Sequence, residues 1–177
     1  PWTAPSGEIY TLTTSLRGDV YNTSQIGSPS DSFRPTEDGI HGRAVPQLEL
    51  NWRYPLIRRD GDIRTIIEPT ASFVATPMFG NQNRFPNEDS RAVEFDETNL
   101  FRTSRFDGLD RVEGGQHVNY GFNSTFIRDN GGRAGLFLGQ SYRLQNESAF
   151  PANSGLNGHE SNYVGRVSFS PHPWLYT

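Results

Sequence analysis

Apolar and polar residues alternate one by one along several long stretches of this chain. In residues 42–56 the even positions are mostly apolar and the odd positions polar, and residues 63–77 resume the alternation after Asp60 and Gly61 interrupt it. Side chains of a β-strand point alternately to its two faces, so this pattern predicts strands with one apolar and one polar face. The same period recurs in residues 8–21, 109–127, 133–144 and 160–170. The chain therefore predicts six antiparallel strands.

The connections between these strands alternate between short and long. Tight turns are expected at "RRDGD", "RDNGG" and "SPHPW", and long polar loops at 22–41, 78–108 and 145–158. A loop of about 30 residues counts against a compact soluble domain, whereas tight turns at one end and long loops at the other are typical of outer-membrane barrels. The predicted fold class is all-β, an antiparallel transmembrane β-barrel segment. As an isolated chain, it should form a curved open sheet with edges near residues 8–21 and 160–170.

A spanning strand needs one face for lipid and one for a wet lumen. The outer face is expected to carry Leu12, Leu48, Leu50, Trp52, Phe73, Tyr120, Phe122, Leu136 and Val167. The inner face is expected to carry Arg17, Glu49, Arg53, Glu68, Asn119 and Arg143. Four aromatic residues lie beside the short turns: Trp52, Tyr54, Trp174 and Tyr176. They form either an interfacial aromatic girdle or ordinary aromatic residues at a sheet edge.

Turn chemistry predicts the register of both hairpins. A two-residue Asp60-Gly61 turn pairs Arg59 with Asp62, which places Trp52 opposite Pro69, Leu50 opposite Ala71 and Arg53 opposite Glu68 as an ion pair. In the second hairpin, a three-residue loop of Asn130, Gly131 and Gly132 places Phe126 opposite Leu136 and keeps both faces consistent.

Composition narrows the class of protein. Among the 177 residues 33% are hydrophobic, the mean hydropathy is −0.66, and the net charge of −4 makes the chain a poor nucleic-acid binder. No Cys is present, and all 16 basic residues are Arg, which reflects either genomic composition bias or a need for bidentate guanidinium contacts. The chain begins Pro-Trp-Thr, so we expect an interior section of a longer protein. No apolar run reaches the roughly 18 to 20 residues of a transmembrane helix.

Several separated blocks occur in an order that resembles one known family. They are "PWTAPSGEIYTL", "GRAVPQLELNWRYPL", "IIEPTASFVATP", "NEDS", "FDETNLF" and "RFDGLDRVEGGQHVNYG", with the weakest likeness after about residue 145. The sequence resembles the lipopolysaccharide-assembly outer-membrane proteins LptD, also called OstA. The resemblance implies localisation in the bacterial outer membrane and a barrel of about 26 strands. It also implies a jelly roll that receives lipopolysaccharide from a periplasmic bridge protein, an LptE-type plug lipoprotein in the lumen, and a lateral exit between the first and last strands.

Residues 1–177 are interpreted as a partial barrel domain of this type, a middle section of the wall that lacks the jelly roll and the terminal strands. Its candidate site is a lumen-facing polar stripe: Arg17, Arg43, Glu49, Arg53, Arg64, Glu68, Arg111, Glu113, Arg143 and Arg166. The stripe is either a ladder of ion pairs that stiffens the wall, or a contact surface for the plug or for sugar and phosphate groups of the glycolipid. Glycines of the same parity, which either leave room for a plug or permit strand curvature, are Gly115, Gly121, Gly135 and Gly139.

The sequence predicts no metal, cofactor or catalytic residues. Histidines at 41, 117, 159 and 172 lack ligand spacing, and no nucleophile has a suitable sequence context. The acidic loop residues Glu88, Asp89, Glu94, Asp96 and Glu97 do not match a calcium loop, so we expect a solvated or lumen-folded loop held by Arg91, Arg102 and Arg105.

Three function classes remain on this basis. The first is a non-enzymatic component that assembles lipopolysaccharide into the outer leaflet. The second is another outer-membrane barrel, such as a porin or a receptor. The third is a barrel hydrolase, which needs an Asp, His and Ser cluster at one strand end.

Overall fold

The computed structural model describes residues 1–24, 38–81, 85–90, 92–145, 150–151 and 153–171. These residues form one open antiparallel sheet with the strand order β1-β2-β3-β5-β6-β7-β8, in which β4 also pairs with β5. The strands are β1 (Trp2–Thr3), β2 (Ile9–Thr23), β3 (Gly39–Arg53), β4 (Leu56–Asp60), β5 (Ile63–Thr76), β6 (Gly115–Arg128), β7 (Arg133–Arg143) and β8 (Val164–Ser170), with a single-turn 3₁₀ helix η1 (Met78–Asn81). The expected open all-β sheet is confirmed. No helix in the described part of the chain is long and apolar enough to cross a membrane.

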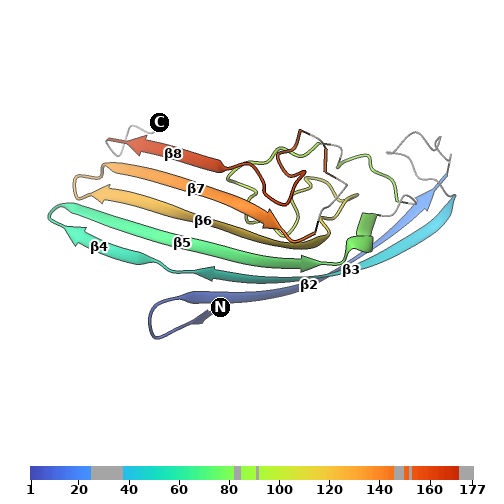
Figure 1. The fold of residues 1–177 in the computed structure, drawn as a ribbon, viewed down its shortest axis with the longest axis horizontal. Coiled ribbons are helices and arrows are strands. Elements are labelled where there is room, and N and C mark those ends of the chain that lie inside the picture. The colour runs from blue at the N-terminus through green and yellow to red at the C-terminus, as the bar shows by residue number, and fades with distance from the viewer. Residues whose placement is uncertain (25–37, 82–84, 91, 146–149, 152, 172–177) are drawn as a thin grey trace.

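The tight turns and the long connections lie at opposite ends of the sheet (Figure 1). The β4–β5 and β6–β7 turns gather at one end, and the segments after β5 and after β7 gather at the other. The expected edges are also found: β8 ends the sheet on one side, and β2 has only the two-residue β1 beyond it on the other. The final turn at "SPHPW", with Trp174, Tyr176 and His172, lies outside the described residues.

The predicted alternation between faces is confirmed. Residues directly opposite each other in a ladder share a face, and Leu12, Leu50, Phe73 and Val118 form one such row across β2, β3, β5 and β6. Glu49, Val74, His117 and Arg143 form the neighbouring row on the other face. Apolar side chains of the first face remain exposed, as for Leu12 at 65% and Val167 at 78%, while Val74, His117 and Arg143 are buried.

The register of the first hairpin differs from the prediction by two residues. Asp60 pairs with Ile63, so the two turn residues are Gly61 and Asp62, and Gly61 takes the positive φ of 59°. Glycine adopts this left-handed conformation without a Cβ clash, which explains why it occupies the first turn position. Trp52 is therefore opposite Ala71, and Leu50 is opposite Phe73. A shift of two preserves the faces, so the pattern of apolar residues could not reveal the error.

The same correction removes the predicted Arg53–Glu68 rung. Arg53 is opposite Thr70, and no ion pair joins Arg53 to Glu68 among the described residues. Between β3 and β4 the regular ladder is interrupted at Tyr54 and Pro55. Tyr54 N–H still donates to Pro69 O at 3.0 Å, but neither Pro55 nor Pro69 has a backbone N–H to donate.

The second hairpin has the predicted three-residue loop, but one position earlier. Arg128 N–H donates to Gly132 O at 2.8 Å, so the loop residues are Asp129, Asn130 and Gly131, with Gly131 at a φ of 90°. Phe126 is consequently opposite Ala134, and the predicted pairing with Leu136 is wrong.

The strand predicted from Leu109 begins only at Gly115, where φ is 86°. The residues that precede Gly115 are outside the sheet. The Asn81 side chain takes the place of a neighbouring strand as hydrogen-bond partner of their backbone: Val112 N–H donates to Asn81 Oδ1 at 2.9 Å, and Asn81 Nδ2 donates to Val112 O at 2.6 Å. Arg111, Val112 and Glu113 thus lie in the loop between β5 and β6, which turns back over the sheet.

Most of the buried apolar side chains come from the long connections. Among the residues that the structure describes, these are Phe85, Val93, Leu100, Phe106, Val112, Phe150 and Leu156, whereas the strands contribute Val45, Val74 and Val164. Phe106 and Phe150 stack with ring centroids 4.7 Å apart, which joins the β5–β6 connection to the β7–β8 connection. The core of this chain therefore lies between its loops and the polar face of its sheet.

Candidate functional site

The β5–β6 connection is anchored on the inner face by an arginine of β3. Arg43, whose side chain is 2% exposed, pairs with Asp19 Oδ2 at 2.6 Å and donates to the backbone carbonyls of Leu109 and Asp110 at 2.7 and 2.8 Å. Its guanidinium carbon lies 5.4 and 5.2 Å from the ring centroids of Tyr21 and Phe85, which also contact each other at 5.5 Å. Arg17 pairs with the same Asp19 at 3.0 Å and also donates to Leu109 O. This arrangement joins the loop to β2 and β3.

Two aspartates fasten the loop to itself. Asp89 accepts from the backbone N–H groups of Leu109 at 2.8 Å and Asp110 at 3.0 Å, and Asp110 in turn accepts from Glu88 N–H at 2.7 Å. Partial burial raises the pKa of Asp89, but these hydrogen bonds outweigh it and lower the pKa to about 2. Gly108 is required beside them, because a Cβ there would lie 2.2 Å from Asp89 Oδ1. The acidic loop is thus folded onto the inner face of the sheet. This corresponds to the second of the two expected arrangements, a solvated or a lumen-folded loop.

A buried carboxylate lies at the centre of the region that the β5–β6 connection covers. Glu113 is fully buried and accepts from Arg105 Nε at 2.8 Å and from Arg143 Nη1 at 2.6 Å. Burial raises the pKa of Glu113, but the hydrogen bond and charge of Arg105 prevail and hold it below its ordinary value. Phe150 lies 4.7 Å from the guanidinium carbon of Arg143. The cluster joins the loop to β7 through paired charges rather than through apolar contact.

His117 is buried on β6 directly opposite Arg143, with Nδ1 3.5 Å from Glu113 Oε1. Neither of its ring nitrogens has a hydrogen-bond partner in the described structure. His159 has a structural role, since its Nδ1 lies 2.7 Å from Arg143 O. No group of three or more potential ligands among the described residues is placed to hold a metal ion.

One inner-face glycine, Gly139, makes room for the chain's own loop. Gly121 and Gly139 are directly opposite each other, and a Cβ on Gly139 would lie 2.4 Å from Leu100 Cδ2. Leu100 is fully buried in this depression. The space that the sequence suggested for a plug is therefore occupied at this point by a side chain of the β5–β6 connection.

Beyond the part covered by the loop, the inner face holds an open groove of about 520 Å³. It lies between the loop and the sheet toward the tight-turn end, and its charged lining residues are Glu49, Arg53, Glu68, Glu97 and Arg166. Phe101 and Phe137 form an aromatic wall, with centroids 6.4 Å apart in an edge-on arrangement. Glu97 lies 3.7 Å from Arg166, and Thr103 Oγ1 donates to Glu49 at 3.2 Å, so both connect the loop to the sheet.

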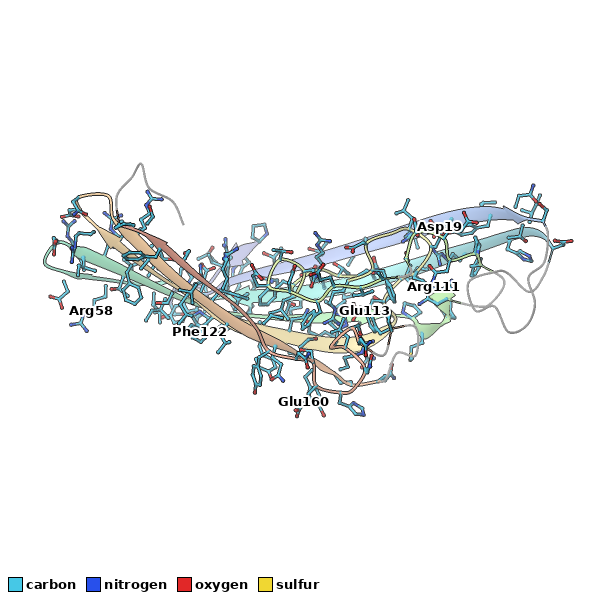
Figure 2. The ribbon with its side chains drawn as sticks, turned by 90° about the horizontal axis from the view of Figure 1, so that it is seen from above. Asp19, Arg58, Arg111, Glu113, Phe122 and Glu160 are labelled. Carbon is cyan, nitrogen blue, oxygen red and sulfur yellow. The ribbon has the colours of Figure 1, made fainter. Side chains whose placement is uncertain are left out.

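The predicted stripe is thus divided by the fold. Its covered members, which lie beneath or within the loop, are Arg17, Arg43, Arg111, Glu113 and Arg143, and its open members are Glu49, Arg53, Glu68 and Arg166. Arg64 joins neither group and lies at the tight-turn end, opposite Arg59 and Ile127. Figure 2 shows this length of the sheet, with Arg58 at the tight-turn end and Asp19 toward the other.

Sequence reasoning identified some loop anchors and missed others. Arg105 was expected to hold the loop and is fully buried at Glu113. Arg102 pairs with Asp107 at 3.6 Å near the surface, and Arg91 lies outside the described residues. The reciprocal roles of Asp89 and Asp110 were missed, because a hydrogen bond between segments 20 residues apart leaves no periodic signal.

The sequence is similar to one protein family and to curated members of that family. The family model described as "LPS transport system D" matches residues 1–177. The LPS-assembly protein LptD of Coxiella burnetii is 29% identical over 116 residues, which are 63% of this chain and 13% of that protein. The LptD of Acinetobacter baylyi is 28% identical over 143 residues, 80% of this chain and 16% of that protein.

A third relative, LptD of Pseudomonas aeruginosa strain LESB58, is 34% identical over 116 residues, 63% of this chain and 12% of that protein. The chain therefore spans a small part of the length of the curated relatives that it matches. The family model, by contrast, covers the chain from end to end, including both the two-faced strands and the loop that folds over them. This chain belongs to the LptD family.

Proposed function

We propose that this chain is part of the wall of an outer-membrane β-barrel that assembles lipopolysaccharide into the outer leaflet. The observation that carries the proposal is the match of the LptD family model to residues 1–177, a chain whose sheet is apolar on one face and polar on the other. Such a sheet suits a wall between lipid and a wet lumen. The activity is transport and assembly, with no enzymatic step and no cofactor.

The partners of the proposed assembly divide between the two faces. The apolar face contacts outer-membrane lipid, and the polar face contacts lipopolysaccharide and an LptE-type plug lipoprotein. The periplasmic bridge protein that supplies lipopolysaccharide docks on a domain outside this chain, and nucleic acid is not a ligand.

Within the polar face, the open groove is the contact region and the covered region is structural. Arg53 and Arg166 present guanidinium groups in the groove, which suit bidentate contacts with carboxylate or phosphate groups of a partner. Arg43 is already surrounded by Asp19, two backbone carbonyls and two aromatic rings, so it supports the loop instead.

A porin or a receptor has the same kind of wall and is the alternative function. The family match favours lipopolysaccharide assembly over both. A barrel hydrolase has less support, since the buried His117 has no Ser and Asp beside it in the described contacts.

Photocrosslinking in living cells tests the proposal. A photoreactive amino acid at Arg53 or Arg166 of the full-length protein should capture lipopolysaccharide or the plug lipoprotein, because both positions face the open groove. The same amino acid at Leu50, on the outer face, should capture neither the plug nor the sugars. Capture of the plug from Leu50, or of neither partner from the groove positions in a protein that still delivers lipopolysaccharide, would contradict this assignment.

A further inference from the structure

An apolar hollow lies on the outer face at the tight-turn end of β6, β7 and β8. Phe126, Ala134 and Phe169 are directly opposite one another on these three strands, so a small side chain stands between two large ones. The resulting hollow measures about 320 Å³, and Pro171 and Arg128 also line it. Phe126 and Phe169 are 44% and 57% exposed, so the hollow opens outward.

Arg128 places a positive charge at the turn side of this hollow. It follows Phe126 by two residues on β6 and therefore shares the outer face. It pairs with Asp62, with Nε 3.5 Å from Oδ2, and both side chains are more than half exposed. An exposed pair of this length is weak and screened by salt. A phosphate offers the guanidinium a stronger, bidentate contact.

The surrounding charge also favours an anion. Residues 56–64 and 128–133, the two turns and their flanks, hold five arginines and three aspartates, although the whole chain has a net charge of −4. Arginine at a membrane interface buries its aliphatic stem along apolar surface and keeps its charge in the headgroup layer. Anionic headgroups attract such basic segments.

We propose that this hollow binds one glycerophospholipid, with an acyl chain against Phe126, Ala134 and Phe169 and the headgroup phosphate at Arg128. The inference rests on the proposed function, because it requires the apolar face to lie in a bilayer. Tight turns of outer-membrane barrels lie on the periplasmic side, so the bound lipid belongs to the inner leaflet of the outer membrane.

Native mass spectrometry of the full-length protein tests this inference. The purified protein is titrated in detergent with dioleoyl phosphatidylglycerol, and retained lipids are counted. Arg128→Gln should weaken the tightest-bound lipid about tenfold, as expected for loss of one charge-assisted contact. Ala134→Phe fills the hollow and should abolish that binding. Arg58→Gln is the matched control, since Arg58 is equally outward-facing and pairs with Asp60 at 3.6 Å, but does not line the hollow.

Three other results would each overturn the inference. Equal losses in Arg58→Gln and Arg128→Gln would indicate diffuse charge attraction, and unchanged binding in both Arg128→Gln and Ala134→Phe would exclude the hollow. A parallel titration with lipid A that gave the tighter, Arg128-dependent binding would exclude a glycerophospholipid as the occupant. Lipopolysaccharide delivery by Arg128→Gln should remain normal, so failure of this inference is distinguishable from failure of the proposed function.

Discussion

Glu113 shows how a single residue can hold a polar loop on a polar sheet. Its carboxylate is fully buried and shared by two guanidinium groups, Arg105 from the loop and Arg143 from β7. Removing one member of a buried charged group leaves the others uncompensated, and this costs far more than loss of an exposed pair.

We predict that Glu113→Gln destabilises the closed loop by about 3 to 5 kcal/mol. Native-state hydrogen exchange of amides 105–113 measures the free energy of loop opening. Glu97→Gln is the control, because its pair with the exposed Arg166 at 3.7 Å should contribute less than about 1 kcal/mol. Similar protection in both variants would show that the buried cluster does not hold the loop.

The same residue gives the loop a pH dependence. The pKa of Glu113 in the folded protein is lowered, so its contribution is complete above the ordinary glutamate pKa of about 4.3 and is lost as pH falls through the folded value. Protection of amides 105–113 should stay constant from about pH 7 to pH 5 and decrease below about pH 4. The Glu113→Gln protein should lack that part of the decrease.

The β5–β6 connection behaves as a folded element rather than as a linker. It contributes Phe85, Leu100, Phe106 and Val112 to the core, and Asp89 and Asp110 close it on itself. Its contact with the sheet depends on the absence of a side chain at Gly139, since Leu100 occupies that space.

We predict that Gly139→Ala displaces this element, at a cost of about 1 to 3 kcal/mol typical of overpacking. The added Cβ would lie 2.4 Å from Leu100 Cδ2 and 2.9 Å from Tyr120 O, so Leu100→Ala in the same chain should restore only part of the loss. Limited proteolysis within residues 85–114 measures the displacement. Gly18→Ala is the control, because nothing lies within 4 Å of a Cβ there. Complete resistance of the Gly139→Ala loop to protease would show that Leu100 does not need the glycine.

At the scale of the whole molecule, the two faces of the sheet meet different solvents in the proposed barrel. Neighbouring residues of one strand face lipid and water in turn. In β6, Phe122 on the outer face and Asn123 on the inner face are a matched pair, and both are exposed in this chain. A charge is costly only where lipid replaces water.

We therefore predict that Phe122→Arg destabilises the full-length barrel by about 2 to 4 kcal/mol in lipid bilayers if the site is near the midplane. Asn123→Arg, one residue away, should have little effect. Chemical unfolding in liposomes measures both. Equal effects of the two substitutions would contradict the assignment of one face to lipid.

Strand existence and facing were predictable because both depend on a local property. Side chains of a strand alternate with a period of two, so Leu50 and Glu49 must lie on opposite faces wherever the strand pairs. Register was less predictable. Gly61 can occupy either position of its turn, and a shift of two residues moves Arg53 from Glu68 to Thr70 without changing any face.

The polar loops were the part of the chain that periodicity described least. For the strands, the alternation correctly predicted which charged residues share a face, whereas Arg111 and Glu113, which were expected on a strand from Leu109, lie in the loop. The division of the lumen-facing polar stripe into covered and open members depends on contacts between distant segments, such as Arg43 with Leu109 and Glu113 with Arg143. Such contacts arise when the chain folds back on itself, and no regular spacing records them. Alternation therefore suffices to specify a two-faced sheet, while the packing of loop on sheet selects the residues that remain available to a partner.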